Sequence, residues 1–277
     1  MSSQHYSPTG FSLLPPVVKN LLIINGLFFL ATVTLENRFQ IDLAKIMGLY
    51  YFGSELFQPY QFITYMFLHA DFQHILYNMF ALWMFGYLLE NVWGSKRFLT
   101  FYVLTGIGAA ITQTVVGHFH YSSIDSALFT YIQAPNIDAF LGFIKSNIRN
   151  IDQNYLNELN SFVSQWSADP QNSEHLNQSI VYLQDLARLN MNVPTIGASG
   201  AVYGILLAFG MMFPNMLVYV WFLFPVKAKW IVIAYGAIEL FSGFSNNPND
   251  NVAHFAHLGG MVFGFFLIIY WRRKSHI

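Results

Sequence analysis

The stretch TIGASGAVYGILLAFGMMFP, residues 195–214, combines a long uncharged apolar run with a serine that has a glycine on its C-terminal side and another two residues before it. A run without charge indicates a helix buried in a protein core or a helix in a membrane. A hydroxyl group at Ser199 is unexpected in both settings, because an apolar side chain such as Leu would pack better there. The rest of the chain has to explain it.

The composition favours the membrane. Of the 277 residues, 55% are hydrophobic and only 10% are charged, whereas soluble domains are about 25% charged. A net charge of −1 gives no reason to expect a nucleic-acid partner, and the absence of cysteine excludes disulfides, thiol catalysis and cysteine-based metal sites. We expect no metal and no cofactor, and we predict an all-α, polytopic membrane protein.

Six apolar segments predict six transmembrane helices, since several approach or exceed the roughly 18 apolar residues that indicate a span. The segments cover residues 21–35, 73–89, 98–116, 199–214, 230–244 and 253–271. The N-terminus lacks a basic region and a small-residue cleavage site, so we expect the first span to be retained. The apolar stretch 215–227 has prolines before and within it, and it predicts a short interfacial or re-entrant piece.

Basic residues in the short loops orient these spans. With the N-terminus in the cytoplasm, the basic residues of every short loop and of the C-terminal tail fall on the cytoplasmic side. They are Lys19, Lys96, Arg97, Lys227, Lys229, Arg272, Arg273 and Lys274. We therefore predict cytoplasmic termini. We also expect the membrane to be a cell membrane, the inner membrane of a bacterium.

Two long segments are predicted on the opposite side. Residues 36–72 are too amphipathic for a span and suit a structure in the outer interface. Residues 118–194 are polar, but apolar residues recur at helical spacing over about 137–166 and 173–190, which predicts an extramembrane helical hairpin. The predicted domains are residues 1–117 with spans one to three, the insert 118–194, and residues 195–277 with spans four to six.

Polar side chains gather at one predicted depth of the membrane. Such groups are costly in a bilayer, so each is a candidate for function. Spans two, four and six all run from outside to inside, and their outer ends carry His74, Asn78, Ser199, His254 and His257. His74 and Asn78 share one helical face. Chance placement would scatter these residues over both sides.

A serine, a histidine and hydrogen-bond donors at one depth can perform nucleophilic catalysis. A histidine can take the hydroxyl proton of a serine and so make it a nucleophile. Ser199 opens a helix, where backbone N–H groups lack partners and can stabilise an oxyanion. His74 and Asn78 can add side-chain donors, while Gly197 and Gly200 leave room for a substrate carbonyl.

Packing, rather than an acid, is expected to hold the base. Tyr203 lies one turn below Ser199 and can stack on an imidazole. Spans four and six each carry a small-residue face that allows close helix approach, formed by Gly200 with Gly204 and by Gly260 with Gly264. The acids near this depth have no motif-like spacing; they are Asp71, Glu239 and Asp250. We therefore predict a Ser–His dyad without a third carboxylate.

The motifs around these residues resemble those of the rhomboid family of intramembrane serine proteases. GASGAVYG resembles the family's nucleophile motif, which implies that Ser199 is the nucleophile and that Tyr203 is the aromatic residue beside the base. AHLGGMVFG resembles the motif of the last span, which implies that His257 is the base. His254 is expected to line or pack beside the site.

The second-span motif extends the resemblance. HADFQHILYN resembles the family's pattern of two histidines and an asparagine, which implies oxyanion-stabilising roles for His74 and Asn78 and a supporting role for His69. ENVWGSKRFLTFYVLTG resembles the family's turn into span three. The resemblance covers all six spans in order. Tyr60-Gln61 departs from the Trp-Arg pair that the family often carries, and the insert is longer than usual.

The resemblance implies an endopeptidase in the lipid bilayer. Its substrates would be single-span membrane proteins, cut within their transmembrane segments near the outer face. The loop 245–252, rich in Asn, Pro and Asp, resembles the mobile cap over such a site.

Two other functions stay open. A catalytically weak rhomboid-like protein could bind membrane helices without cutting them, although loss of the serine or the histidine would be its signature and both are present. A transporter could line a pathway with such residues, but it would carry polar groups through the full depth of the membrane, and the inner halves of the spans are apolar.

Overall fold

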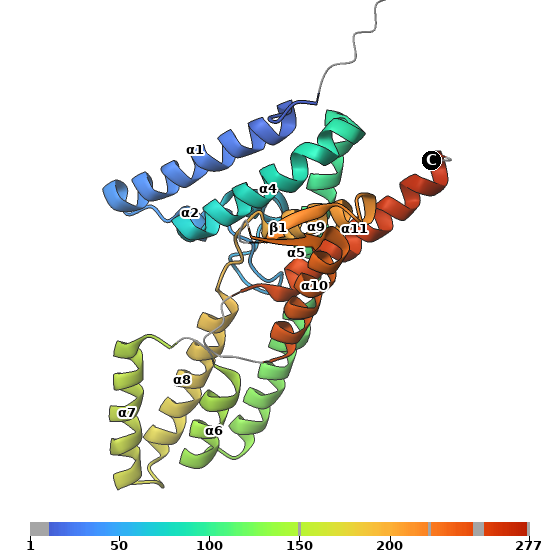
Figure 1. Ribbon diagram of the computed structural model, residues 1–277. Helices are drawn as coiled ribbons and strands as arrows, with labels where there is room; N and C mark the ends of the chain where they lie inside the picture. Colours follow the sequence, from blue (N-terminus) through green and yellow to red (C-terminus); the bar gives the residue numbers. More distant parts are fainter. Residues whose placement is uncertain (1–10, 149–150, 221–222, 246–251, 276–277) are drawn as a thin grey trace, which may run out of the picture.

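A bundle of long helices contains the six apolar segments, and a group of shorter helices projects from the end away from the C-terminus (Figure 1). The computed structural model describes residues 11–148, 151–220, 223–245 and 252–275. The bundle helices are α1 (Pro16–Phe39), α4 (Phe72–Trp93), α5 (Ser95–Gln133), α9 (Ser199–Met212), α10 (Ala228–Phe244) and α11 (His254–Ser275). Helices α1, α5 and α11 are by themselves long and apolar enough to cross a membrane, and the six-span topology stays a prediction.

Local sequence signals set where the bundle helices begin and end. Asp71 caps α4, since its carboxylate accepts the backbone N–H of His74 at 2.7 Å. Gly94 ends α4 with a φ of +79°, a conformation that favours glycine. The Glu90 carboxylate accepts the backbone N–H groups of Val17 and Val18 at 2.9 and 2.8 Å, so it caps the start of α1. The contacts of Glu90 join the start of α1 to the end of α4.

The core of the bundle lies between α4, α5, α9 and α11. Its largest fully buried side chains include Leu82, Phe98, Phe101, Tyr102 and Phe209. Many large apolar side chains on the outer faces of α1 and α10 are exposed, as Leu27 and Phe241 are. An apolar exterior around a packed core is what a bilayer requires, in line with an integral multi-pass membrane protein.

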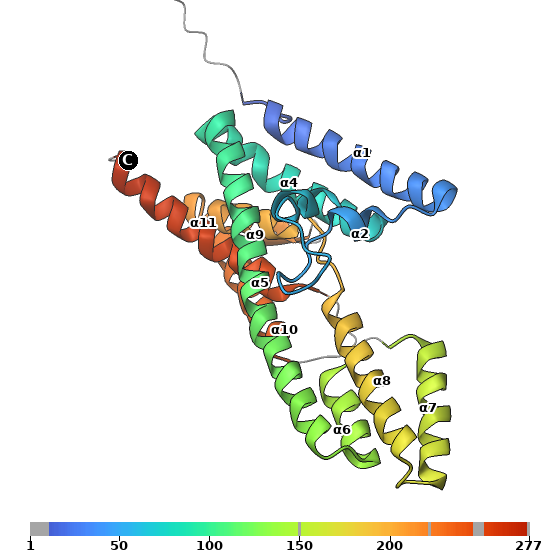
Figure 2. The same ribbon diagram turned by 180° about the vertical axis from the view of Figure 1, so that it is seen from behind.

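The insert contains more helices than the predicted helical hairpin, and it has a hydrophobic core of its own. The third apolar segment, 98–116, is only the first half of α5, which continues without a break to Gln133 (Figure 2). The end of α5 packs with α6 (Ile137–Asn147), α7 (Gln153–Ala168) and α8 (Ser173–Met191). Their separate core consists of Ile124, Tyr131, Phe140, Phe143, Leu159, Phe162, Trp166, Leu183, Leu186 and Ala187.

The single helix predicted over 137–166 is two helices, so that prediction was wrong in detail. The backbone of Ile148 is extended and ends α6, and Asp152 caps α7 by accepting the backbone N–H groups of Asn154 and Tyr155. The apolar spacing continues across this break because both helices bury side chains in the same core. The helix predicted over 173–190 agrees closely with α8.

The two predicted interfacial segments have different structures. Between the end of α1 and the start of α4, the segment 36–72 contains the short helices α2 (Leu43–Met47) and α3 (Gln61–Thr64) and the 3-10 turn η1 (Tyr65–Phe67), and its place at the outer interface stays a prediction. The apolar stretch 215–227 forms an antiparallel hairpin of β1 (Leu217–Val220) and β2 (Phe224–Lys227), with Leu217 opposite Lys227. The fold is therefore mostly helical rather than all-α. Of the predicted cap, residues 246–251 lie outside the described residues.

Candidate active site

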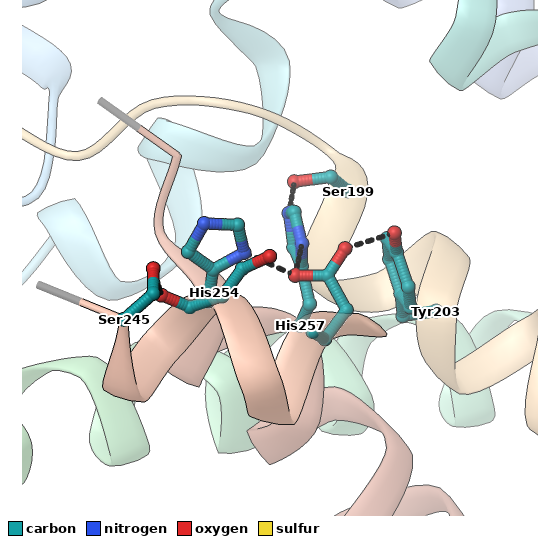
Figure 3. Close-up of polar contacts among 7 residues, drawn as sticks. Ser199, Tyr203, Ser245, His254 and His257 are labelled. Atoms are coloured by element: carbon teal, nitrogen blue, oxygen red, sulfur yellow. Dashed lines mark hydrogen bonds and ion pairs between the residues drawn. The ribbon is translucent and has the colours of Figure 1, made fainter. Parts of the chain in front are cut away.

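Ser199 and His257 meet between α9 and α11. Ser199 is the first residue of α9 and is half-buried, while His257 lies in the first turn of α11 and is buried. The hydroxyl oxygen of Ser199 is 2.7 Å from Nε2 of His257 (Figure 3). This distance is right for direct proton transfer from the hydroxyl to the ring. The two residues are 58 positions apart in sequence and come from different helices.

Glycine allows the two helices to come this close. A Cβ built on Gly260 would lie 1.9 Å from the carbonyl oxygen of Gly200, so the α9 and α11 backbones are in direct contact at this level. One turn further along α11, a Cβ on Gly264 would lie 3.5 Å from Cα and O of Gly204. The two small-residue faces of the sequence thus face each other.

Tyr203 holds the imidazole from one side. Its ring is stacked on the ring of His257, with centroids 4.2 Å apart and planes at 8° (Figure 3). Tyr203 follows Ser199 by one helical turn, so α9 presents the hydroxyl and the stacking ring on the same face. A stacked ring has fewer orientations open to it, which keeps Nε2 directed at the serine.

His74 faces the space next to the hydroxyl group. A Cβ built on Gly197 would lie 2.9 Å from Nε2 of His74 and 3.5 Å from the Ser199 oxygen. Gly197 has a φ of +129°, which side chains rarely tolerate. The backbone N–H of Ala70 donates to Nδ1 of His74 at 3.4 Å. An accepting ring nitrogen is unprotonated, so the proton of the neutral ring lies on Nε2, directed at the site.

Asn78 and His69 are buried behind His74. The side-chain amide of Asn78 donates to the backbone carbonyl of His74 at 3.1 Å, one turn back along its own helix. The ring of His69 lies edge-on to that of His74, with centroids 5.0 Å apart. The structure brings both residues to His74, and among the described residues neither of them forms a hydrogen bond with Ser199.

An acid lies beside the histidine, against the sequence prediction. Oε2 of Glu239, on α10, is 3.0 Å from Nδ1 of His257 and 2.6 Å from Nδ1 of His254. The hydroxyl of Tyr203 donates to the other carboxylate oxygen. The sequence did contain a signal, because an acid inside an apolar span is costly and a candidate for function. Spacing could not reveal the contact, since α10 and α11 are brought together only by packing.

The other acids considered from the sequence are elsewhere. Asp71 caps α4, and Asp250 lies outside the described residues. Glu239, His254 and His257 each offer one ligand atom, and these atoms lie within 4.8 Å of one another, so they are the group in the described chain that could hold a metal ion. Short direct contacts between the oxygen and the two nitrogens join these atoms in the structure.

Fold and site together define the class of protein: an integral, multi-pass helical membrane protein with a serine and a histidine in hydrogen-bond contact. The model of the Rhomboid domain matches residues 56–147 and 162–274, which is most of the chain. The chain therefore belongs to the rhomboid family, and the resemblance of its motifs is confirmed.

Two relatives match shorter stretches. The chain is 30% identical over 95 residues to the rhomboid protease GluP of Bacillus subtilis (strain 168), covering 32% of this chain and 19% of GluP. It is 32% identical over 97 residues to the chloroplastic Rhomboid-like protein 11 of Arabidopsis thaliana, covering 33% of this chain and 34% of that protein. The matches thus span about a fifth and a third of the lengths of these relatives.

Proposed function

We propose that the protein is an intramembrane serine endopeptidase that cuts the transmembrane segments of single-span membrane proteins near the outer face. The contact between the Ser199 hydroxyl and Nε2 of His257 carries this proposal. Family membership and a relative named as a protease agree with it. The proposed setting is a cell membrane, with both termini in the cytoplasm and the insert outside.

In the proposed reaction, His257 accepts the Ser199 proton at Nε2 while the serine oxygen attacks the scissile carbonyl carbon. The carbonyl oxygen becomes an oxyanion, which the Nε2–H of His74 and the free backbone N–H groups at the start of α9 stabilise. The tetrahedral intermediate collapses, and His257 gives its proton to the leaving amine. Water then attacks the acyl-enzyme by the same route and regenerates the hydroxyl group.

A serine-directed fluorophosphonate tests this proposal directly. We expect the wild-type protein, reconstituted in lipid vesicles, to be labelled and to cleave a single-span test substrate. Labelling and cleavage should both disappear in Ser199→Ala and His257→Ala. Ser126→Ala removes an exposed serine on α5 and should change neither. If the well-folded wild-type protein is neither labelled nor active, the proposal that it is a protease is contradicted. That result would favour the second candidate function, a rhomboid-like protein that binds membrane helices.

The insert is proposed to control access to the site or to recognise substrate ectodomains. Its last helix is tied to the interfacial segment, because Arg188 pairs with Glu55 and the hydroxyl of Ser54 donates to the side-chain oxygen of Asn192 at 2.6 Å. Residues 192–198 then lead directly to Ser199. Replacing residues 122–190 by a flexible linker should change cleavage of several substrates unequally. Cleavage of all of them at the wild-type rates would mean that the insert has no role in access or in recognition.

A further inference from the structure

Glu239 is a buried acid in an apolar helix of the bundle. It is 5% exposed, on a helix whose neighbouring side chains are apolar. A carboxylate buried in such a place costs a great deal of free energy unless donors surround it. Tyr203 donates to one oxygen, Nδ1 of His254 is hydrogen-bonded to the other at 2.6 Å, and Nδ1 of His257 lies 3.0 Å from that second oxygen. All three approach the same carboxylate from α9 and α11.

Proton positions follow from these contacts. Because Nε2 of His257 must accept the Ser199 proton, the proton of the neutral ring has to lie on Nδ1. Nδ1 is the atom that lies 3.0 Å from the Glu239 carboxylate. It is buried and makes no aligned hydrogen bond to any described residue, so the carboxylate is the acceptor within reach. Contacts of this kind are often imperfectly aligned in a free enzyme and tighten when the substrate binds.

We propose that Glu239 is a positioning residue for His257, which completes a Ser199–His257–Glu239 triad; this rests on the proposed protease function. The carboxylate holds His257 in the tautomer with the proton on Nδ1 and stabilises the imidazolium that forms when the serine is deprotonated. The Nδ1 proton stays on the ring throughout, and the proton taken from the serine leaves through Nε2 to the amine.

Tyr203 and His254 have a supporting part in this arrangement. The hydroxyl of Tyr203 donates to Oε1 while its ring stacks on His257, so one side chain restrains both the acid and the base. His254 donates from Nδ1 to the same oxygen that faces His257. His254 and His257 are three residues apart on α11, which places both rings on the side of α10.

Glu239→Gln tests the triad, because it keeps the shape of the side chain and removes its charge. We expect kcat for a single-span substrate to fall by about 10²-fold with little change in KM. This is less than the loss of about 10⁴-fold seen when a serine-protease aspartate becomes asparagine, since the Tyr203 stack still holds the ring. Glu239→Asp, which retains the charge, should recover a measurable part of kcat. Glu36→Gln, the same change at an exposed site on α1, is the matched control and should behave as wild type.

The outcomes separate this inference from the proposed function. If wild type is active and Ser199→Ala is inactive, but Glu239→Gln keeps full kcat, the triad is wrong and the dyad remains. If wild type is neither labelled nor active, the protease proposal itself fails. If a chelator abolishes wild-type activity and added zinc restores it, Glu239, His254 and His257 form a metal site instead, and the triad assignment is overturned.

A measurement on unmodified protein covers the case in which the Glu239 variants do not fold. A ring proton on Nδ1 that is shared with a carboxylate gives a strongly downfield proton resonance. Both His254 and His257 have Nδ1 close to the Glu239 carboxylate, so we expect two such resonances in wild type. One should disappear in His254→Gln, and the other should remain in His254→Gln and disappear in His257→Gln. Absence of the His257 resonance, with the protein folded and active, would overturn the assignment of Glu239.

Discussion

Gly260→Ala is expected to separate the two halves of the proposed catalytic site. The added methyl group would lie 1.9 Å from the carbonyl oxygen of Gly200 and 2.8 Å from its carbonyl carbon. Real Cβ atoms essentially never approach closer than 3.0 Å, so the backbones must separate by at least 1.1 Å, the difference between 3.0 and 1.9 Å. The obstacle is backbone, which cannot rotate away as the end of a side chain can.

The size of the effect follows from the hydrogen bond one turn away. If the whole displacement is along the contact, the distance from Ser199 Oγ to His257 Nε2 rises from 2.7 Å to 3.8 Å, beyond hydrogen-bond range. A misplacement of about 1 Å can cost about 10²-fold in rate, and overpacking typically costs about 1–3 kcal/mol of stability. We expect a rate loss of about 10²-fold and a lower melting temperature.

Gly264→Ala is the matched control, on the same face of α11. There the added Cβ would meet the tip of the Phe101 ring at 3.0 Å and Gly204 at 3.5 Å, distances that a small side-chain movement relieves. We expect a rate within about threefold of wild type, since volume changes that the core can absorb cost little. Cleavage of a single-span substrate and thermal unfolding in detergent measure both variants. Equal rates for Gly260→Ala and wild type would refute the close-contact argument.

Two further predictions concern the histidines. His74→Ala should lower kcat by about 10²-fold, the cost of one oxyanion donor, and Asn78→Ala should lower it less, because the Asn78 amide is bonded to a backbone carbonyl; the two rates measured side by side decide this. Burial, and then the neighbouring His74, lower the pKa of His69 from 6.5 to about 4. The unfolded chain therefore binds a proton first, and the melting temperature should fall between pH 6.5 and 4, less steeply in His69→Gln.

The long helices that contain the six apolar segments could be predicted from local sequence. Each of the six apolar segments falls within or overlaps one long helix, because apolar length is a local property that does not depend on neighbours. The positions at which the helices end were harder to predict from the sequence. The third segment ends near residue 116 by composition, yet α5 continues to Gln133, because its polar second half is stabilised by packing against α6 and α8 rather than by lipid. The hairpin of β1 and β2 was missed for a related reason, since an apolar run of this length does not distinguish strand from interfacial helix.

The site was predictable where residues lie on one helix or form a motif, and not where they meet across helices. Ser199 and Tyr203 are one turn apart, so their shared face follows from helical geometry alone. The contact of Ser199 with His257 was inferred from topology and the motifs, and in the structure the Ser199 oxygen lies 2.7 Å from Nε2 of His257. Glu239 was set aside because it has no motif-like spacing, and only the packing of α10 against α9 and α11 brings it to the ring.

The carboxylate also explains how α10 is held to the bundle. Apart from Glu239, the buried residues of α10 are Ala228, Ile231 and Val232, all within its first five residues. Its later part carries large exposed side chains such as Ile238 and Phe241, which suit contact with lipid. Hydrogen bonds to a charged group contribute about 1.5–3 kcal/mol each, which offsets the cost of burying the carboxylate. Those from Tyr203 and His254 join this half of α10 to α9 and α11. A substitution at Glu239 can therefore change the packing of α10 as well as the proposed orientation of His257, and it has to be judged by kcat and by the order of α10 together.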